Sequence, residues 1–163
     1  MRYFNFLVLL FVLIPIKAIA LIEVDITRGN LNPLPIAVSS LSIDNKSNKI
    51  LKEILKKENI GSEISIVVEN NLKTSGLFNP LNKDAFLQEA NIAHLKPRFE
   101  DWALIKAQAL ITGKVTYEDE KLRVEFRLWD VLAAKEMMAL AFTTVPSNWR
   151  RVGHIITDKV YER

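Results

Sequence analysis

The chain has 163 residues, of which 49% are hydrophobic and 25% are charged, a composition typical of a folded globular protein. It contains no cysteine, which excludes a disulfide framework, a thiol nucleophile and a thiolate metal site. Lysine and arginine outnumber aspartate and glutamate by only 22 to 19, and a net charge of +3 is poor evidence for nucleic-acid binding.

The first twenty residues have the pattern of a secretory signal peptide. Arg2 forms a small basic region, residues 4–16 are apolar apart from Asn5 and Pro15, and residues 18–20 read Ala-Ile-Ala, the small-residue pattern of a cleavage site. The apolar segment is too short for the ~20 residues of a membrane span. We therefore predict a cleaved signal peptide over residues 1–20 and a periplasmic location, with an uncleaved membrane anchor as the alternative. The mature chain would keep 20 basic and 19 acidic residues, which leaves it close to neutral.

The mature chain, residues 21–163, is predicted to be one domain of mixed helix and strand. Residues 23–27 alternate polar and apolar side chains, which favours a short edge strand directly behind the cleavage site. Residues 28–33 contain Gly, Asn and Pro and form a turn cluster. A short buried strand is expected over residues 35–38, with proline at its first position.

A lysine-rich segment over residues 46–57 is predicted to be helical, because the apolar residues within it fall at helical spacing. One interpretation is a basic helix that binds a membrane surface or nucleic acid. The other is a solvated helix face with one narrow apolar stripe, which we favour because no aromatic residue interleaves the lysines. The apolar positions are Ile50, Leu51, Ile54 and Leu55.

A second helix is predicted over residues 61–76, with Ser62 as its N-cap and Gly76 just past its C-terminus. Residues 64–68 would also suit a strand, but the caps and the length of about four turns favour a helix. Residues 77–81 then form an extended segment at a sheet edge. The apolar face of this helix consists of Ile64, Val67, Val68 and Leu72.

The second half of the chain predicts a short helix followed by a three-stranded meander. The helix spans residues 99–106 and leads into a buried strand over residues 107–115. A polar hairpin turn at residues 118–121 connects this strand to residues 122–129, whose strict alternation is the strongest strand signal in the chain. A third strand is expected near residues 136–143. The predicted buried face of the middle strand consists of Leu122, Val124, Phe126 and Leu128.

A last amphipathic helix is predicted to start at Pro146 and Ser147, with Ser147 as its N-cap, and to pack on the sheet. Its apolar periodicity still runs at residues 161–163, and neither glycine nor proline closes it. This ending is the pattern of a domain that another segment once followed. The apolar face consists of Trp149, Val152, Ile156 and Val160.

No arrangement of residues predicts a reaction centre. His94 and His154 lie sixty positions apart without the spacing of metal ligands, and His154 is expected at the surface or boundary of its helix. With only five glycines, the chain contains no nucleotide-binding or nucleophile-elbow motif. We therefore expect neither an enzyme nor a bound cofactor or metal. The tryptophans are predicted to be core or boundary residues with a partner for each indole N–H: Trp102, Trp129 and Trp149.

Two local motifs and the order of the elements resemble a known family. The motifs are S-G-x-F-x-P-L, which begins at Ser75, and R-x-x-G-H-x-x-x-D-x-V-x-E, which begins at Arg150. With the other matching stretches they resemble the N-terminal domain of the TolB family, a periplasmic component of the Tol–Pal cell-envelope system, over essentially the whole mature chain. The stretches that carry the resemblance are residues 23–29, 35–38, 72–81, 109–115, 128–130 and 149–163.

The resemblance implies an α/β (α+β) fold, a small mixed sheet covered by two longer amphipathic helices. In the family this domain precedes a six-bladed β-propeller, works by protein–protein contact without catalysis, and binds the inner-membrane protein TolA through its N-terminal segment. The propeller binds the lipoprotein Pal, so a contact with Pal is not expected for this chain. By resemblance the TolA-binding residues are Glu23, Val24, Asp25, Ile26 and Thr27.

The resemblance leaves two functional interpretations open. In the first, the chain is a periplasmic interaction module of the Tol–Pal system, with roles in outer-membrane integrity and protein import, that contacts TolA through residues 23–27. In the second, it is the structural half of a split or truncated TolB and needs a separately encoded propeller. The lysine-rich segment is longer than the corresponding family loop, and binding to a membrane surface through it is a third, weaker interpretation.

Overall fold

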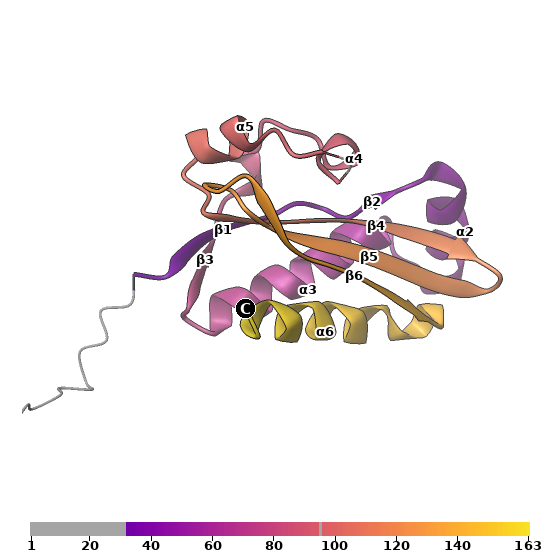
Figure 1. Ribbon diagram of the computed structural model, residues 1–163. Coiled ribbons are helices and arrows are strands. Elements are labelled where there is room, and N and C mark those ends of the chain that lie inside the picture. Colours follow the sequence, from indigo (N-terminus) through magenta and orange to yellow (C-terminus); the bar gives the residue numbers. More distant parts are fainter. Residues whose placement is uncertain (1–31, 95) are drawn as a thin grey trace, which may run out of the picture. The chain divides into compact units, whose positions relative to one another are not determined.

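A computed structural model describes residues 32–94 and 96–163 (Figure 1). The predicted signal peptide, the strand expected at residues 23–27 and most of the turn cluster at 28–33 lie outside the described residues. The strands are β1 (Leu34–Val38), β2 (Ser42–Ile43), β3 (Phe78–Pro80), β4 (Ala109–Glu118), β5 (Lys121–Asp130) and β6 (Lys135–Thr144). The helices are α2 (Asn45–Leu55), α3 (Ile60–Thr74), α4 (Ala90–Ala93), α5 (Phe99–Leu104) and α6 (Trp149–Tyr161), with 3₁₀ turns η2 (Lys83–Ala85) and η3 (Pro146–Asn148).

One mixed sheet organises the described residues, in the order β3-β1-β4-β5-β6. β1 pairs in parallel with β3 and β4, and β2 pairs with β4 further along the same side. β4, β5 and β6 form an antiparallel meander, as the sequence predicts. The fold class expected from the sequence, a mixed sheet with two longer helices, is therefore confirmed.

α3 and α6 lie side by side on one face of the sheet and enclose the main core (Figure 1). The apolar stripes predicted for both helices are buried there, apart from Trp149, which is half-buried. The alternation of β5 is also confirmed, because Leu122, Val124, Phe126 and Leu128 are all buried against these helices. Burying this one face of the meander stabilises the α3–α6 layer on the sheet.

A second, smaller core lies on the opposite face, under α4 and α5 (Figure 1). Trp102 fills it and makes an edge-to-face contact with Phe86, with ring centroids 5.0 Å apart. Its indole N–H donates to the Oε1 atom of Gln88 over 3.1 Å. The sequence predicts α5 but neither α4 nor this layer, which covers the sheet at β1 and β4. The cluster consists of Ala37, Ala93, Trp102, Ala107, Leu110 and Val131.

Two predicted N-caps are wrong. α3 begins at Ile60, and the carboxamide of Asn59 caps it by accepting from the backbone N–H of Ser62 over 3.0 Å. Ser147 lies inside η3, and no side chain caps α6. In both cases an upstream residue starts the turn, Asn59 through its side-chain oxygen and Pro146 through its restricted φ. The position predicted for Gly76 is confirmed by its φ of 72°.

Candidate functional site

The TolA-binding residues predicted from the resemblance, residues 23–27, lie outside the described residues, so their role stays a prediction. The described residues present three other features that could bind a ligand or partner. These are a polar hollow on the open face of the sheet, an apolar hollow at one end of the sheet, and the free edge of β6.

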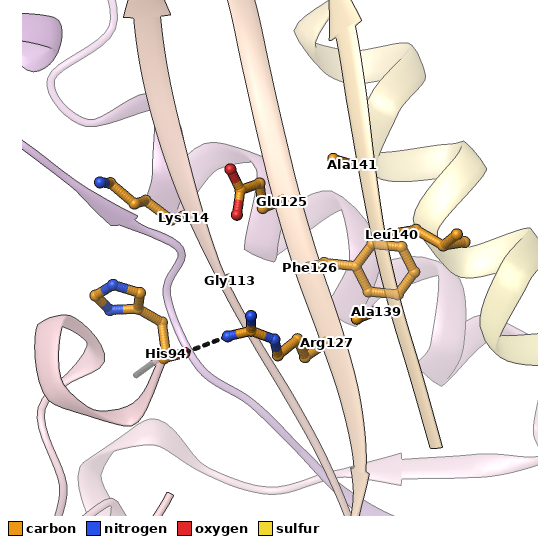
Figure 2. A pocket seen from close by; sticks show the side chains of 9 residues that line it. All are labelled: His94, Gly113, Lys114, Glu125, Phe126, Arg127, Ala139, Leu140 and Ala141. Atoms are coloured by element: carbon orange, nitrogen blue, oxygen red, sulfur yellow. Dashed lines mark hydrogen bonds between the residues drawn. The ribbon is translucent and has the colours of Figure 1, made fainter. Parts of the chain in front are cut away.

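The polar hollow has a volume of about 190 Å³ and lies on the sheet face that α3 and α6 do not cover (Figure 2). Its side chains come from the three strands of the meander and from the loop that follows α4. The small side chains of Ala139 and Ala141 leave space on β6, next to the longer charged side chains of β5 and β4. The lining residues are His94, Gly113, Lys114, Glu125, Phe126, Arg127, Ala139, Leu140 and Ala141.

The charges around this polar hollow are largely paired with one another. Arg127 donates from Nη1 to the carbonyl oxygen of His94 over 3.0 Å, which Figure 2 shows, and its Nε lies 3.1 Å from Glu136. Glu125 forms an ion pair with Arg123 at 3.0 Å. Such exposed pairs contribute only about 0–1 kcal/mol each. Their geometry is that of a solvated, self-neutralised surface, with no paired nucleophile and base.

The side chain of His154 is exposed, as predicted for a residue off the apolar stripe of α6, and it faces Asn71 of α3. The side-chain amide of Asn71 lies 2.9 Å from His154 Nδ1 and donates to the hydroxyl of Thr157 over 3.2 Å. The hydroxyl of Tyr161 donates to the carbonyl oxygen of Asn71 over 2.9 Å. When the amide of Asn71 donates, Nδ1 accepts, as it can in the tautomer that carries its proton on Nε2. The histidine therefore joins two helices in a polar seam.

A second hollow, of about 280 Å³, opens at the end of the sheet where β5 leads into β6. Most of its lining is aliphatic or aromatic, including Leu34 and Ile36 of β1 and Phe78 of β3. Leu132, beside it in the β5–β6 turn, is 72% exposed. No sequence pattern predicts this apolar surface, because residues from five strands and one helix meet there only in the folded chain.

Within residues 32–94 and 96–163, no group of three or more His, Asp or Glu side chains could hold a metal ion. The same part of the chain contains no helix long and apolar enough to cross a membrane. Two of the tryptophan predictions are confirmed, because Trp129 donates to the hydroxyl of Thr112 over 2.9 Å and Trp102 donates to Gln88. Trp149 is half-buried and packs against the main core, the boundary position expected for it.

Comparison with known sequences identifies one family. The model of the TolB amino-terminal domain matches residues 22–137. A curated relative, the Tol-Pal system protein TolB of Pelagibacter ubique (strain HTCC1062), is 82% identical over 159 residues, which are 98% of this chain and 36% of the relative. The chain therefore spans about a third of the length of this relative.

Comparison with solved structures gives the same fold. TolB from Acinetobacter baumannii matches 80% of this chain and 28% of its own, with a TM-score of 0.59 and 20% identity. A lipoprotein of Neisseria meningitidis matches 80% of this chain and 96% of its own, with a TM-score of 0.50 and 16% identity. At these identities the likeness concerns the fold alone.

Proposed function

Because the chain belongs to the TolB amino-terminal domain family, we propose that it is a non-catalytic protein-interaction module of the Tol–Pal system in the periplasm. Its partner is the periplasmic domain of TolA, which it contacts through Glu23, Val24, Asp25, Ile26 and Thr27. The observation that carries the proposal is the 82% identity to a Tol-Pal system protein over nearly the whole chain. Membership of this family supports a role without catalysis.

The chemistry of the N-terminal segment supports this contact. Residues 23–27 alternate polar and apolar side chains and precede β1 by a few residues. An alternating segment near a chain terminus can add to the sheet edge of another protein, with backbone hydrogen bonds giving affinity and alternate side chains giving specificity. The rest of the domain would then serve as a rigid base for the segment.

The decisive experiment is a pulldown on the TolA periplasmic domain with two forms of the chain, residues 21–163 and residues 29–163. We expect the longer form to bind and the shorter form to lose binding by at least about tenfold, because it lacks the pairing strand. Circular dichroism of both forms provides the folding control. Equal binding by the two forms would place the contact outside residues 23–27 and contradict the proposal.

A second candidate function follows from the length of the relative, of which the chain matches 36%. In this alternative the chain is a structural half that functions only when a separately encoded propeller docks on it. The apolar hollow at the end of the sheet is a surface on which such a partner could pack. A folded chain that binds TolA in neither form, but does so after a propeller is added, would favour this alternative.

A further inference from the structure

The two edges of the sheet differ in how they are protected. The edge at β3 has three residues and ends in Pro80, and both a short strand and a proline block further pairing. The edge at β6 has ten residues with neither proline nor glycine. Among the described residues, β6 pairs with β5 alone. Its outward N–H and C=O groups therefore offer a long template for another strand.

β6 also carries fewer charged residues than edge strands normally do. Its two charged residues, Lys135 and Glu136, stand at its beginning, and residues 137–144 are uncharged. Natural edges normally place charges, above all lysine, along the strand to prevent pairing. No residue of β6 is fully buried, and both Met137 and Leu140 are 37% exposed. Another strand would cover this apolar surface.

The pattern of side chains on β6 indicates which strand would fit. Its pairing with β5 places Met138, Leu140 and Phe142 on the face with α3 and α6, because their partners Leu128, Phe126 and Val124 are buried there. Ala139, Ala141 and Thr143 lie on the open face. A matching strand must therefore be apolar on one face, small and uncharged on the other, and free of charges along its middle. β6 itself has this pattern.

We propose that two copies of this chain associate through β6, antiparallel about a two-fold axis at Leu140, into one continuous sheet. In this register Leu140 faces Leu140 of the second copy, and Met138 faces Phe142 of the second copy. The pairing of β6 with β5 is irregular at Met137, so the regular part of the strand begins at Met138; residues 138–144 are uncharged, and no like charges are opposed there. The nearby ion pairs of Arg123 with Glu125 and Arg127 with Glu136 leave these charges neutralised beside the new strand. Such an isologous contact closes on itself.

The absence of cysteine makes this register directly testable by cross-linking. Directly opposed residues of antiparallel strands have Cα atoms about 4.5–5.5 Å apart, within the range of about 4.4–6.8 Å that a disulfide spans. The chain is expressed with its own N-terminus, and the Leu140→Cys variant is oxidised at micromolar concentration. We expect it to form a covalent dimer on a non-reducing gel.

Met138→Cys is the matched control, because it lies on the same face two residues away. In the proposed register its nearest copy in the second chain is about 13 Å distant along the strand, so the single variant should stay monomeric. The double variant Met138→Cys/Phe142→Cys should cross-link. A monomeric Leu140→Cys, or equal cross-linking of the two single variants, would overturn the proposal.

Sedimentation of the unmodified chain provides an independent measurement without any partner protein, so its outcome does not depend on TolA binding. We expect a concentration-dependent dimer, with its dissociation constant raised at least about tenfold in Leu140→Lys, since two lysines would then face each other. Leu132→Lys alters an exposed residue outside the strand and should leave the dimer unchanged. A chain that is monomeric at every concentration, or that forms open-ended aggregates, would contradict the two-fold pairing.

Discussion

At the scale of single residues, Gly153 shows how a missing side chain sets the distance between two helices. A Cβ atom at this position of α6 would lie 2.8 Å from Cγ1 and 2.9 Å from Cβ of Val67 on α3. These distances are far shorter than normal carbon contacts. The glycine of the G-H motif is therefore explained by helix packing, and its neighbour His154 by the seam with Asn71.

We predict that Gly153→Ala destabilises the protein by about 1–3 kcal/mol, because the added methyl group forces α3 and α6 apart. This loss should exceed the benefit of about 1 kcal/mol that alanine normally brings to a helix interior. Chemical denaturation measures the free energy of unfolding. The double variant Gly153→Ala/Val67→Ala removes the clash, and its failure to recover part of the loss would contradict the steric explanation.

Asp44, the N-cap of α2, makes the stability of this helix depend on pH. The backbone N–H of Ser47 donates to its Oδ1 over 2.9 Å, and the Ser47 hydroxyl donates to its Oδ2 over 2.7 Å. Both hydrogen bonds lower the pKa of Asp44 below its ordinary value, and the bond from the backbone N–H has the larger effect. Because the pKa is lower in the folded state, the stabilisation is present above the unfolded pKa of about 4 and is lost as the pH falls through the folded pKa.

We therefore predict that the stability difference between the unmodified chain and Asp44→Asn depends on pH. Asparagine also caps helices, so it keeps the cap while removing the ionisation. Denaturation at pH 7 and at pH 3 gives the difference at each pH, and the advantage of aspartate should shrink at the lower pH. A difference that is the same at both pH values would exclude ionised Asp44 as its source.

At the scale of elements, the layer of α4 and α5 depends on one buried glutamine. Gln88 Oε1 accepts from the indole of Trp102 over 3.1 Å and from the backbone N–H of Arg98 over 2.9 Å. Its Nε2 donates to the carbonyl oxygen of Lys96 over 3.1 Å. A single side chain thus satisfies three polar groups in the connection between β3 and β4, a role that no sequence pattern marks.

We predict that Gln88→Leu lowers the free energy of unfolding by about 1–3 kcal/mol for each buried donor left unpaired. We also expect the resulting loss of structure to be confined to the layer of α4 and α5. Hydrogen exchange should lose protection in α4 and α5 while the β4–β6 meander stays protected, because α3 and α6 hold its other face. Gln88→Glu would bury a carboxylate and place one of its oxygens against the carbonyl oxygen of Lys96, so it should cost at least as much as Gln88→Leu. An equal loss of protection throughout the sheet would contradict a local role.

The turn between β4 and β5 is a second local feature that affects stability, through its backbone conformation. Asp119 and Glu120 both have positive φ, 48° and 58°, which the right-handed twist of a two-residue hairpin requires. Neither residue is the glycine that adopts this conformation without strain. The turn therefore stores a small amount of backbone strain at the tip of the hairpin.

Glu120→Gly is expected to stabilise the protein by up to about 1 kcal/mol, because glycine relieves the strained φ of the turn. Thermal denaturation detects this as a higher Tm. Lys121→Gly, one residue further on and inside β5, is the matched control and should lower Tm, since glycine weakens a strand. If both variants lower Tm, the strain at Glu120 does not limit stability.

At the scale of the whole molecule, the two hydrophobic clusters that the described residues form lie within residues 34–160. We predict that a form consisting of residues 32–163 unfolds cooperatively, with a free energy of unfolding within about 1 kcal/mol of the 21–163 form. Denaturation followed by circular dichroism and by tryptophan fluorescence measures this. Non-coincident transitions, or a much larger loss of stability, would mean that residues 21–31 belong to the core.

The sequence by itself determined the order and type of most elements. The periods of two in β5 and of about 3.6 in α3 and α6 are local properties of the chain, because one face of each element must be apolar to be buried. The cap at Gly76 was equally readable, since only glycine adopts its φ readily. The family resemblance depended on the same local motifs, and it was confirmed.

Only the tertiary structure decided which elements meet and which surfaces are left open. The layer around Gln88 and Trp102, the apolar hollow and the helix contact at Gly153 join residues that are distant in sequence, and their energies depend on geometry that no local pattern contains. The same is true of β6: its residues read as an ordinary strand, but its position at the edge follows from the sheet order alone.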